Sequence, residues 1–259
     1  MATVRRNCED WRLHRSTDNG FYQVDPTDSG TSFEVECDLA SNPARTIIHH
    51  DKEPRTFYSR SSNGNYMTVD VTYWIALEKI DAVKTRALSC SQYVKMECYR
   101  DGVEFAENKA YWLGRHSEKY TYWGDVNGYS GYCECGLAGN CANSGDKCNC
   151  ETSSYDWKYD DGTLVDMSTV PLTQLRSDHL ANNARGYHTI GPLICIDVDP
   201  RAWIETPAGV TLTFIIVVMS VLSIVMVSLT CYRKQLWKLL TWKCKRKKSV
   251  TLVYKNGTF

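Results

Sequence analysis

Cysteine placement constrains this chain of 259 residues more than any other feature of its sequence. Ten of the 12 cysteines fall between residues 8 and 195, and the other two follow residue 230. An even, dense set in one segment is typical of a disulfide framework, which forms and persists in oxidising compartments. We therefore expect an outward-facing segment with disulfides at Cys8, Cys37, Cys90, Cys98, Cys133, Cys135, Cys141, Cys148, Cys150 and Cys195.

Two C-x-C pairs, Cys133 with Cys135 and Cys148 with Cys150, offer a metal site as the alternative. Thiolates at short spacing bind Zn²⁺, but the usual zinc spacing is C-x2-C, and thiols outside the cell become oxidised. We therefore favour disulfides. Because the two members of a C-x-C pair do not easily bond to each other, we expect the cysteines from Cys133 to Cys195 to cross-link separate segments, and the sequence does not choose among the connectivities.

A stretch of 27 residues without a charge, from Thr206 to Tyr232, separates an acidic part of the chain from a basic one. All 30 acidic residues lie at or before Glu205, whereas nine of the 30 basic residues follow Tyr232. Residues 1–206 therefore carry a formal charge of −9, and residues 233–259 carry +9. Charge segregated in this way is atypical of a simple soluble protein, and also of a nucleic-acid binder with one basic domain.

The centre of that stretch, residues 211–229, is long and apolar enough to cross a hydrocarbon core of roughly 30 Å. A buried helix of a soluble core is the alternative, but the basic cluster that follows favours a transmembrane helix. The positive-inside rule then predicts an extracellular domain at 1–206 with its core at 8–197, a single transmembrane helix at 207–232 and a cytoplasmic tail at 233–259. The opening MATVRRNCEDW has no apolar run typical of a signal peptide, so either the span directs export or, as we favour, a first exon is missing.

The expected tail begins with a basic cluster. Trp237, Leu240 and Cys244 recur at helical spacing, so a helix would lay an apolar stripe on the lipid bilayer. Each basic residue near an anionic leaflet contributes roughly 1 kcal/mol, which favours anionic phospholipids as ligands; a plain stop-transfer cluster is the alternative. Cys231 and Cys244 are candidates for acylation. The basic residues are Arg233, Lys234, Lys238, Lys243, Lys245, Arg246, Lys247 and Lys248.

Alternation of apolar and polar residues predicts strands at 20–26, 32–39, 45–50 and 191–198. In the second of these, Cys37 lies on the apolar face, where Cys8 can meet it. The period becomes helical from Asp70, and we expect a helix over about 71–90. The loop between Cys90 and Cys98 is short enough for a local disulfide.

Residues 111–157 are rich in aromatic residues, glycine and cysteine. Disulfides are expected to replace regular structure there, and aromatic rings to supply most of the apolar area. This part of the chain contains YWG at 122–124, CECG at 133–136, CNC at 148–150 and WKYDDG at 157–162, followed by VPLTQL at 170–175 and GPLIC at 191–195. Together with NGFYQVDP and SFEVECDL near the amino terminus, this pattern resembles the fibrinogen-like module of contactin-associated proteins, which are neurexin-like adhesion receptors.

The resemblance covers about residues 8–197. It implies an α+β fold, namely a fibrinogen C-terminal-like disulfide-rich ectodomain, here with a single transmembrane helix, and a role at the plasma membrane. The discoidin, laminin-G and EGF-like modules that accompany this module in family members are not found in the sequence. The family's own partners are therefore not implied.

Other site chemistry is weakly supported. Asp156, Asp160 and Asp161 precede Gly162, and fibrinogen-type domains often hold Ca²⁺ in an acidic loop, but the D-x-D-x-D spacing is absent, which favours a solvated acidic turn. The six histidines are scattered, and the sequence has no G-x-S-x-G, H-E-x-x-H or phosphate-binding glycine loop. We therefore expect no enzyme activity, no metal and no cofactor.

These observations predict a non-enzymatic cell-surface protein that binds an extracellular protein ligand or co-receptor in cell adhesion or receptor recognition, and no nucleic acid. Tyr129 and Tyr132 are the expected contact residues, since tyrosine offers a large rigid area at small entropic cost. Two alternatives remain. One is a fibrinogen-related lectin that recognises acetylated sugars, and the other is an accessory subunit that assembles in cis with a larger receptor.

Overall fold

A computed structural model of the chain describes residues 4–14, 17–60, 64, 66–100, 104–105, 107–126, 128–151, 155–178, 180, 182–199 and 219. The chain divides into two compact units, residues 1–200 and residues 201–259, and all named helices and strands lie in the first. The apolar stretch at 207–232, apart from Met219, and the basic tail lie outside the described residues. The expectations for Cys231, Cys244 and the tail therefore stay predictions.

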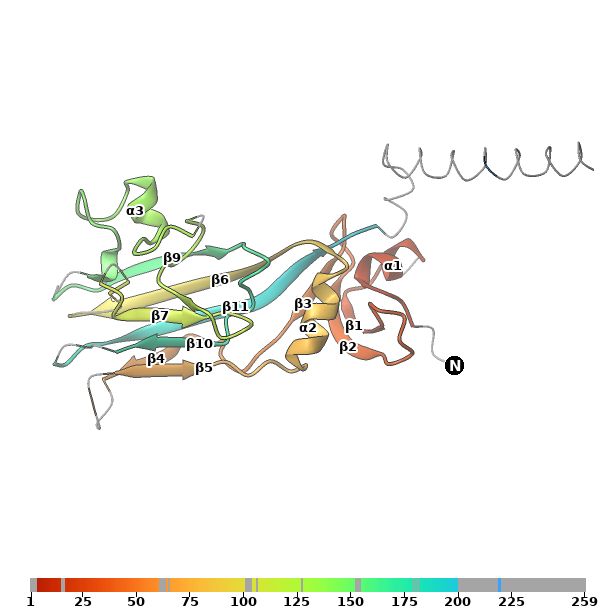
Figure 1. The fold of residues 1–259 in the computed structure, drawn as a ribbon, viewed down its shortest axis with the longest axis horizontal. Helices are drawn as coiled ribbons and strands as arrows, with labels where there is room; N and C mark the ends of the chain where they lie inside the picture. The colour runs from red at the N-terminus through yellow and green to blue at the C-terminus, as the bar shows by residue number, and fades with distance from the viewer. Residues whose placement is uncertain are drawn as a thin grey trace, which may run out of the picture. The chain divides into compact units, whose positions relative to one another are not determined.

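The described part of the first unit is built mainly from strands (Figure 1). Its helices are α1 (Cys8–Leu13), α2 (Leu77–Lys84) and α3 (Glu134–Ala138), with one 3-10 turn, η1 (Asn149–Glu151). Its strands are β1 (Gly20–Val24), β2 (Phe33–Asp38), β3 (Arg45–Ile48), β4 (Thr56–Ser59), β5 (Met67–Asp70), β6 (Ala87–Tyr99), β7 (Ala110–Leu113), β8 (Lys119–Tyr120), β9 (Lys158–Leu164), β10 (Gln174–Ser177) and β11 (Arg185–Asp197).

Strands β6 and β11, of 13 residues each, form the centre of a seven-stranded antiparallel sheet. β11 pairs with β6 along one edge and with β3 and then β4 along the other (Figure 1). β2 and β1 follow β3, and β9 follows β6. A second, four-stranded antiparallel sheet has the order β5-β10-β7-β8.

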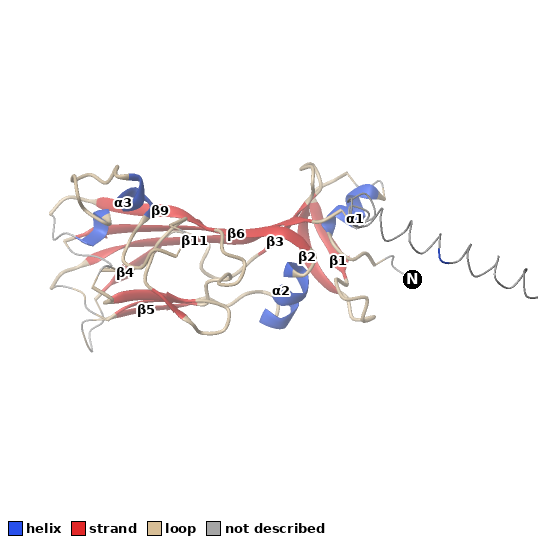
Figure 2. Ribbon diagram, turned by 45° about the horizontal axis from the view of Figure 1, so that its top comes forward, coloured by secondary structure: helices blue, strands red, loops and turns tan. Residues whose placement is uncertain are grey.

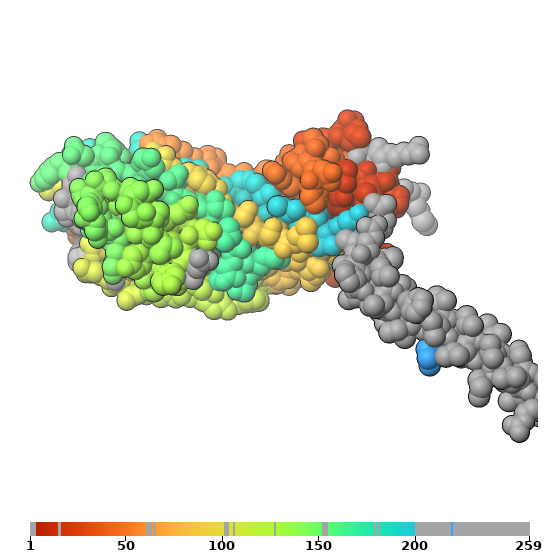
Figure 3. Space-filling view, turned by 90° about the horizontal axis from the view of Figure 1, so that it is seen from above, coloured from red at the N-terminus to blue at the C-terminus, as the bar shows by residue number. Residues whose placement is uncertain are grey.

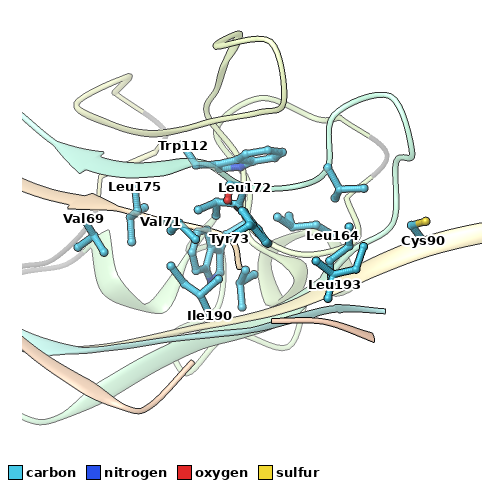
Figure 4. Packing of buried hydrophobic residues seen from close by; sticks show 14 of the residues in the cluster. Val69, Val71, Tyr73, Cys90, Trp112, Leu164, Leu172, Leu175, Ile190 and Leu193 are labelled. Carbon is cyan, nitrogen blue, oxygen red and sulfur yellow. Dashed lines mark hydrogen bonds between the residues drawn. The ribbon is translucent and has the colours of Figure 1, made fainter. Parts of the chain in front are cut away.

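The core lies between the two sheets. Trp112 and Leu175 from the smaller sheet pack with Ile190 and Leu193 from β11 and with Leu164 from β9 (Figure 4). All five side chains are buried, and complete burial of one such side chain stabilises the fold by roughly 1.5–3 kcal/mol. The cysteine-rich segment, in green, gathers at one end of the unit, and the amino-terminal residues, in red, at the other (Figure 3).

For the part of the chain that the structure describes, the expected fibrinogen C-terminal-like α+β fold with a single transmembrane helix is wrong. Strands predominate, and the three α-helices have only six, eight and five residues (Figure 2). Among the described residues, no helix combines the length and the apolar character needed to cross a bilayer. The β-rich outcome follows from β6 and β11, where buried and exposed side chains alternate through most of each strand and so suit a sheet with one covered face.

The expected strands at 20–26, 32–39, 45–50 and 191–198 are confirmed as β1, β2, β3 and the second half of β11. The expected helix at 71–90 is wrong at both ends. The Thr72 amide donates to the Asp51 carboxylate and the Trp74 amide donates to the His49 carbonyl, so the chain stays extended there and α2 begins only at Leu77. From Ala87 the chain pairs with β11, so Cys90 lies on a strand rather than at a helix end.

The expected disulfide framework is confirmed, because all ten cysteines between residues 8 and 195 are paired. The pairs are Cys8–Cys37, Cys90–Cys195, Cys98–Cys150, Cys133–Cys148 and Cys135–Cys141. The expected local Cys90–Cys98 bond is wrong, because eight residues of one extended strand separate their Cα atoms by about 26 Å. The cysteines from Cys133 to Cys195 do not pair only with one another, because Cys195 bonds to Cys90 and Cys150 bonds to Cys98, both on β6.

A buried hydrogen-bond network joins the two sheets where the register between β6 and β11 shifts after Ile190. Gln92 is fully buried and donates through Nε2 to Tyr73 Oη at 2.8 Å and to the Gly191 carbonyl at 3.0 Å. Its Oε1 accepts from the Leu172 amide at 3.0 Å, and Tyr73 donates to the Leu172 carbonyl at 3.0 Å. These bonds satisfy backbone groups that the irregular ladder would otherwise leave buried and unpaired.

His188 on β11 is also buried, and its Nδ1 has no hydrogen-bond partner among the described residues. Burial, assisted by the charge of Lys52, lowers the pKa of His188 to about 4. The imidazole is therefore neutral at neutral pH.

The disulfide pairs predict the products of tryptic digestion under non-reducing conditions. Cleavage after Lys95 separates Cys90 from Cys98, so mass spectrometry should find peptide 87–95 joined to peptide 186–201, and peptide 148–158 joined to both 96–100 and 120–147. A product that joins 87–95 to 96–100 would contradict the strand assignment of β6.

His188 should make stability depend on pH in the mildly acidic range. Its pKa is about 6.5 in the unfolded chain and about 4 when folded, so the stability gained by keeping it neutral is complete above about pH 6.5 and is lost as the pH falls toward 4. Between pH 7 and pH 4.5, urea unfolding should show wild type losing about 2–3 kcal/mol more than His188→Gln. Burial raises the pKa of Asp160 to about 6 and that of Asp197 to about 7. Protonation of these two carboxylates therefore adds stability as the pH falls, and it does so equally in the wild type and in His188→Gln. Equal losses in the two proteins would therefore refute the role given to His188.

Candidate functional site

Six aromatic side chains gather on the face of the larger sheet that points away from the core. Along β6 the buried residues run from Cys90 to Cys98 at every second position, so the intervening residues face outward. The register places Phe57 of β4 opposite Tyr187 of β11, Tyr187 opposite Glu97 of β6, and Glu97 opposite Tyr159 of β9. We call this surface the aromatic face, and its rings are Phe57, Tyr93, Tyr99, Trp157, Tyr159 and Tyr187.

Four of these rings form a continuous row. The ring centroids are separated by 5.5 Å between Phe57 and Tyr187, by 5.8 Å between Tyr187 and Trp157, and by 5.5 Å between Trp157 and Tyr99. Distances in this range are those of attractive aromatic pairs, each worth about 0.5–1.5 kcal/mol beyond the buried area. The rings therefore hold one another in place before any ligand arrives.

Cationic side chains lie over three rings of the aromatic face. The guanidinium carbon of Arg55 is 3.3 Å from the centroid of Tyr187, and that of Arg185 is 4.8 Å from the centroid of Tyr99. The ammonium of Lys95 is 4.7 Å from the centroid of Tyr159. Each is within cation–π distance, which at exposed sites contributes roughly 0.5–1 kcal/mol.

Glu97 lies among these cations in the middle of the face. Its carboxylate accepts from Arg55 Nε at 2.5 Å and lies 3.6 Å from Lys95 Nζ. The hydrogen bond to Glu97 raises the pKa of Arg55, so the guanidinium stays charged at any physiological pH. At the edge, Tyr93 donates to Asp161 at 2.9 Å, and partial burial together with that bond raises the pKa of Tyr93 to about 12.

The aromatic face is open to solvent despite these contacts. Phe57 is 53% exposed, Trp157 50% and Tyr159 54%. Large rings that remain half exposed in a folded domain mark a binding surface more often than isolated exposed apolar residues do. Tyr, Trp and Arg are also the residue types that dominate binding energy in protein interfaces. The arrangement is therefore suited to recognise another macromolecule by stacking and charge.

The two predicted contact residues lie elsewhere, in the loop before α3. Tyr129 is 59% exposed, whereas Tyr132 is half buried against the core with Lys147 Nζ 5.1 Å from its ring centroid. Trp157 was part of the aromatic-rich segment recognised in the sequence. The other rings of the face come from segments far apart in the chain, and only the strand pairing brings them together. The sequence signal that indicates part of this face is the alternation in 87–99, where Tyr93 and Tyr99 alternate with the residues that are buried.

The residues that suggested metal sites are used structurally. Cys133 and Cys148 lie with Asp160 in one buried cluster, but the two sulfurs form a disulfide and present no thiolate. Asp160 accepts from the amides of Asn149 and Cys150 at 2.9 and 2.8 Å and faces inward from β9. Asp161 faces outward on the same strand, so these two carboxylates do not converge on one ion. The acidic turn expected at 156–162 is wrong, because residues 158–164 form β9.

Two glycines of the recognised motifs, Gly124 and Gly162, lie where two segments of backbone approach each other closely. Gly124, of YWG, has φ +85°. A Cβ on Gly162, of WKYDDG, would lie 2.7 Å from the Cα of Gly124 and would overlap the Glu134 carboxylate. These motif residues therefore allow the loop before α3 to pack on β9.

Comparison with known proteins places the sequence near one class of cell-surface protein. No protein-family model matches the chain. Over 219 residues the chain is 29% identical to contactin-associated protein 1 from mouse (Mus musculus), human (Homo sapiens) and rat (Rattus norvegicus). The match covers 81% of this chain but only 16% of each relative, so the chain spans about a sixth of the length of the curated relatives it matches. The chain is thus similar to a region of a contactin-associated protein, and these relatives do not confirm the expected fibrinogen-like module.

Proposed function

We propose that this chain is a non-enzymatic recognition protein whose disulfide-stapled β domain binds an extracellular protein partner in cell adhesion. The observation that carries the proposal is the aromatic face, with its row of Phe57, Tyr187, Trp157 and Tyr99 and the cations above it. The similarity to contactin-associated protein 1 supports the same class of function.

The geometry of the face favours a protein ligand for two physical reasons. First, the rings are already packed against one another, so little side-chain entropy is lost when a partner covers them. Second, Arg55, Lys95 and Arg185 outnumber the carboxylates of Glu97 and Asp161 on the face. A partner with an apolar centre and acidic residues around it would complement this surface, and the charges would speed its association.

The relatives' name states an association with contactin, so a contactin ectodomain is the first candidate ligand. Contactin is proposed here as a ligand from the relatives' name, and the match covers 16% of each relative. The same surface would serve whether the partner lies on the same cell or on a facing one. Both arrangements are included in the proposal.

The double variant Trp157→Ala, Tyr159→Ala tests the aromatic face. Both side chains are half exposed, so the change should leave folding intact while removing two anchors of the surface. We expect binding of a contactin ectodomain to the immobilised full-length chain to weaken at least about tenfold, measured by biolayer interferometry, because central aromatic anchors each contribute roughly 1–2 kcal/mol or more.

Trp74→Ala is the matched control, because Trp74 is 66% exposed, lies outside the aromatic face and should leave binding unchanged. Tyr129→Ala serves as a second control on the loop before α3. Failure of the wild type to capture contactin would reject that ligand. Equal capture by the wild type and the double variant would reject the aromatic face as the binding surface.

A further inference from the structure

A groove of about 730 Å³ runs between β4 of the larger sheet and β5 of the smaller one. All four residues of each strand line it, from Thr56 to Ser59 and from Met67 to Asp70. Its volume lies within the range of natural ligand sites, roughly 300–1,000 Å³. Apart from Phe57, which lines both, the groove is separate from the aromatic face.

The edge of β5 that borders the groove is already partly used by the chain itself. Just beyond β5, the Asp51 amide donates to the Thr72 carbonyl at 3.1 Å, and the Trp74 amide donates to the His49 carbonyl at 3.0 Å. His50 and Tyr73 form an antiparallel bridge at the same place. After Asp51 the chain turns away, so this short antiparallel pairing stops where the groove begins.

Along the rest of that edge, no described strand bonds to the backbone groups of β5 that point away from β10, so a partner strand can pair with them. In an antiparallel pair, alternate residues bond to the neighbouring strand and the others point away from it. Val71 donates to Thr173 on the β10 side at 2.9 Å, whereas Thr72 bonds on the opposite side. The alternation therefore directs the amides and carbonyls of Thr68 and Asp70 toward the groove, and no described strand pairs with β5 there.

The opposite wall of the groove is also an open edge. β4 pairs with β11, and no described strand pairs with its other side. Because Arg60 donates to the Ala184 carbonyl of the β11 side, the alternation directs the backbone of Ser59 and Phe57 away from β11. The floor between the two edges is formed by buried side chains. They are Tyr58, Met67, Val69 and His188.

We propose that this groove binds an extended segment of another protein, which adds as an antiparallel strand to the open edge of β5 and continues the pairing begun by His49–Asp51. Strand addition of this kind takes its affinity from backbone hydrogen bonds and its specificity from pockets for alternate side chains. The site differs from the aromatic face in its elements and in its chemistry, and it does not depend on the function proposed above.

The groove specifies the chemistry of the segment. Four residues of edge accept about 13 Å of extended chain. Side chains of the bound segment that point inward meet Met67, Val69 and Tyr58, so we expect them to be apolar. At His188, whose Nδ1 is unpartnered among the described residues, a hydroxyl or amide of the segment can donate a hydrogen bond instead. Side chains directed outward lie in water beside Lys52 and Asp70 and are polar.

Thr68→Pro and Thr68→Val form a matched pair that tests the proposal. Proline removes the amide that points into the groove but breaks no bond to β10, so it is tolerated on this edge. Valine removes the hydroxyl and keeps the amide. Phage-displayed random twelve-residue peptides are selected on the immobilised full-length wild type and depleted on full-length Thr68→Pro. We expect enriched peptides to bind Thr68→Val as they bind the wild type, and to bind Thr68→Pro at least about tenfold more weakly.

Amide hydrogen exchange of the wild type with a selected peptide supplies a readout that does not depend on the folding of the proline variant. Exchange at Thr68 and Asp70 should slow when the peptide is bound. The proposal is overturned if depletion leaves no binding peptide, or if the peptides leave exchange at Thr68 and Asp70 unchanged. It is also overturned if the wild type dimerises and Thr68→Pro is monomeric in sedimentation, since a second copy would then be the occupant.

Discussion

The pairing of β6 with β11 is the interaction on which the rest of the structure depends. The two strands run antiparallel over 13 residues each, and Cys90 and Cys195 are directly opposite each other and joined by a disulfide. The bond closes a loop across 105 residues of sequence, and in the chain-entropy account a closure of that length stabilises the fold by about 4–5 kcal/mol. Every other strand of the larger sheet attaches to this pair directly or through one or two neighbours.

Both candidate binding sites are consequences of this strand pair. The outward side chains of β6 and β11 carry Tyr99 and Tyr187, and the neighbouring strands add Phe57 and Tyr159 in register. β11 also holds β4 at a distance from β5, which leaves a groove between two open strand edges. One domain thus presents an aromatic surface with cations and, separately, a groove between two strand edges with which no described strand pairs.

The parts of the fold that sequence reasoning predicted are those fixed by local alternation. The strand at 32–39 shows a clean period of two, and it placed Cys37 on the face where Cys8 meets it. The strand at 87–99 is not predicted, because residues up to about 90 are expected in a helix and residues 91–97 in a loop, and the polar Gln92 interrupts the apolar set that faces the core. The burial of Gln92 depends on Tyr73 and Leu172, whose approach no local pattern reveals.

The same non-local dependence explains why the sequence does not indicate the aromatic face. Tyr129 lies in a segment dense in aromatic residues, whereas the aromatic face draws its rings from four strands and from Trp157 just before β9, spread over about 130 residues of sequence. Composition shows that a segment has many rings. Only the register of the sheet shows which rings of separate segments share one surface.

Native-state hydrogen exchange of the full-length chain tests the central role of the β6–β11 pair most directly. Amides in the most stable cooperative unit exchange last, at the free energy of global unfolding. We expect the slowest amides of residues 4–199 to lie in 90–98 and 188–196, and to exchange more slowly than those of β1, β8 and α2. Faster exchange in 90–98 than in these peripheral elements would show that the strand pair is not what holds the domain together.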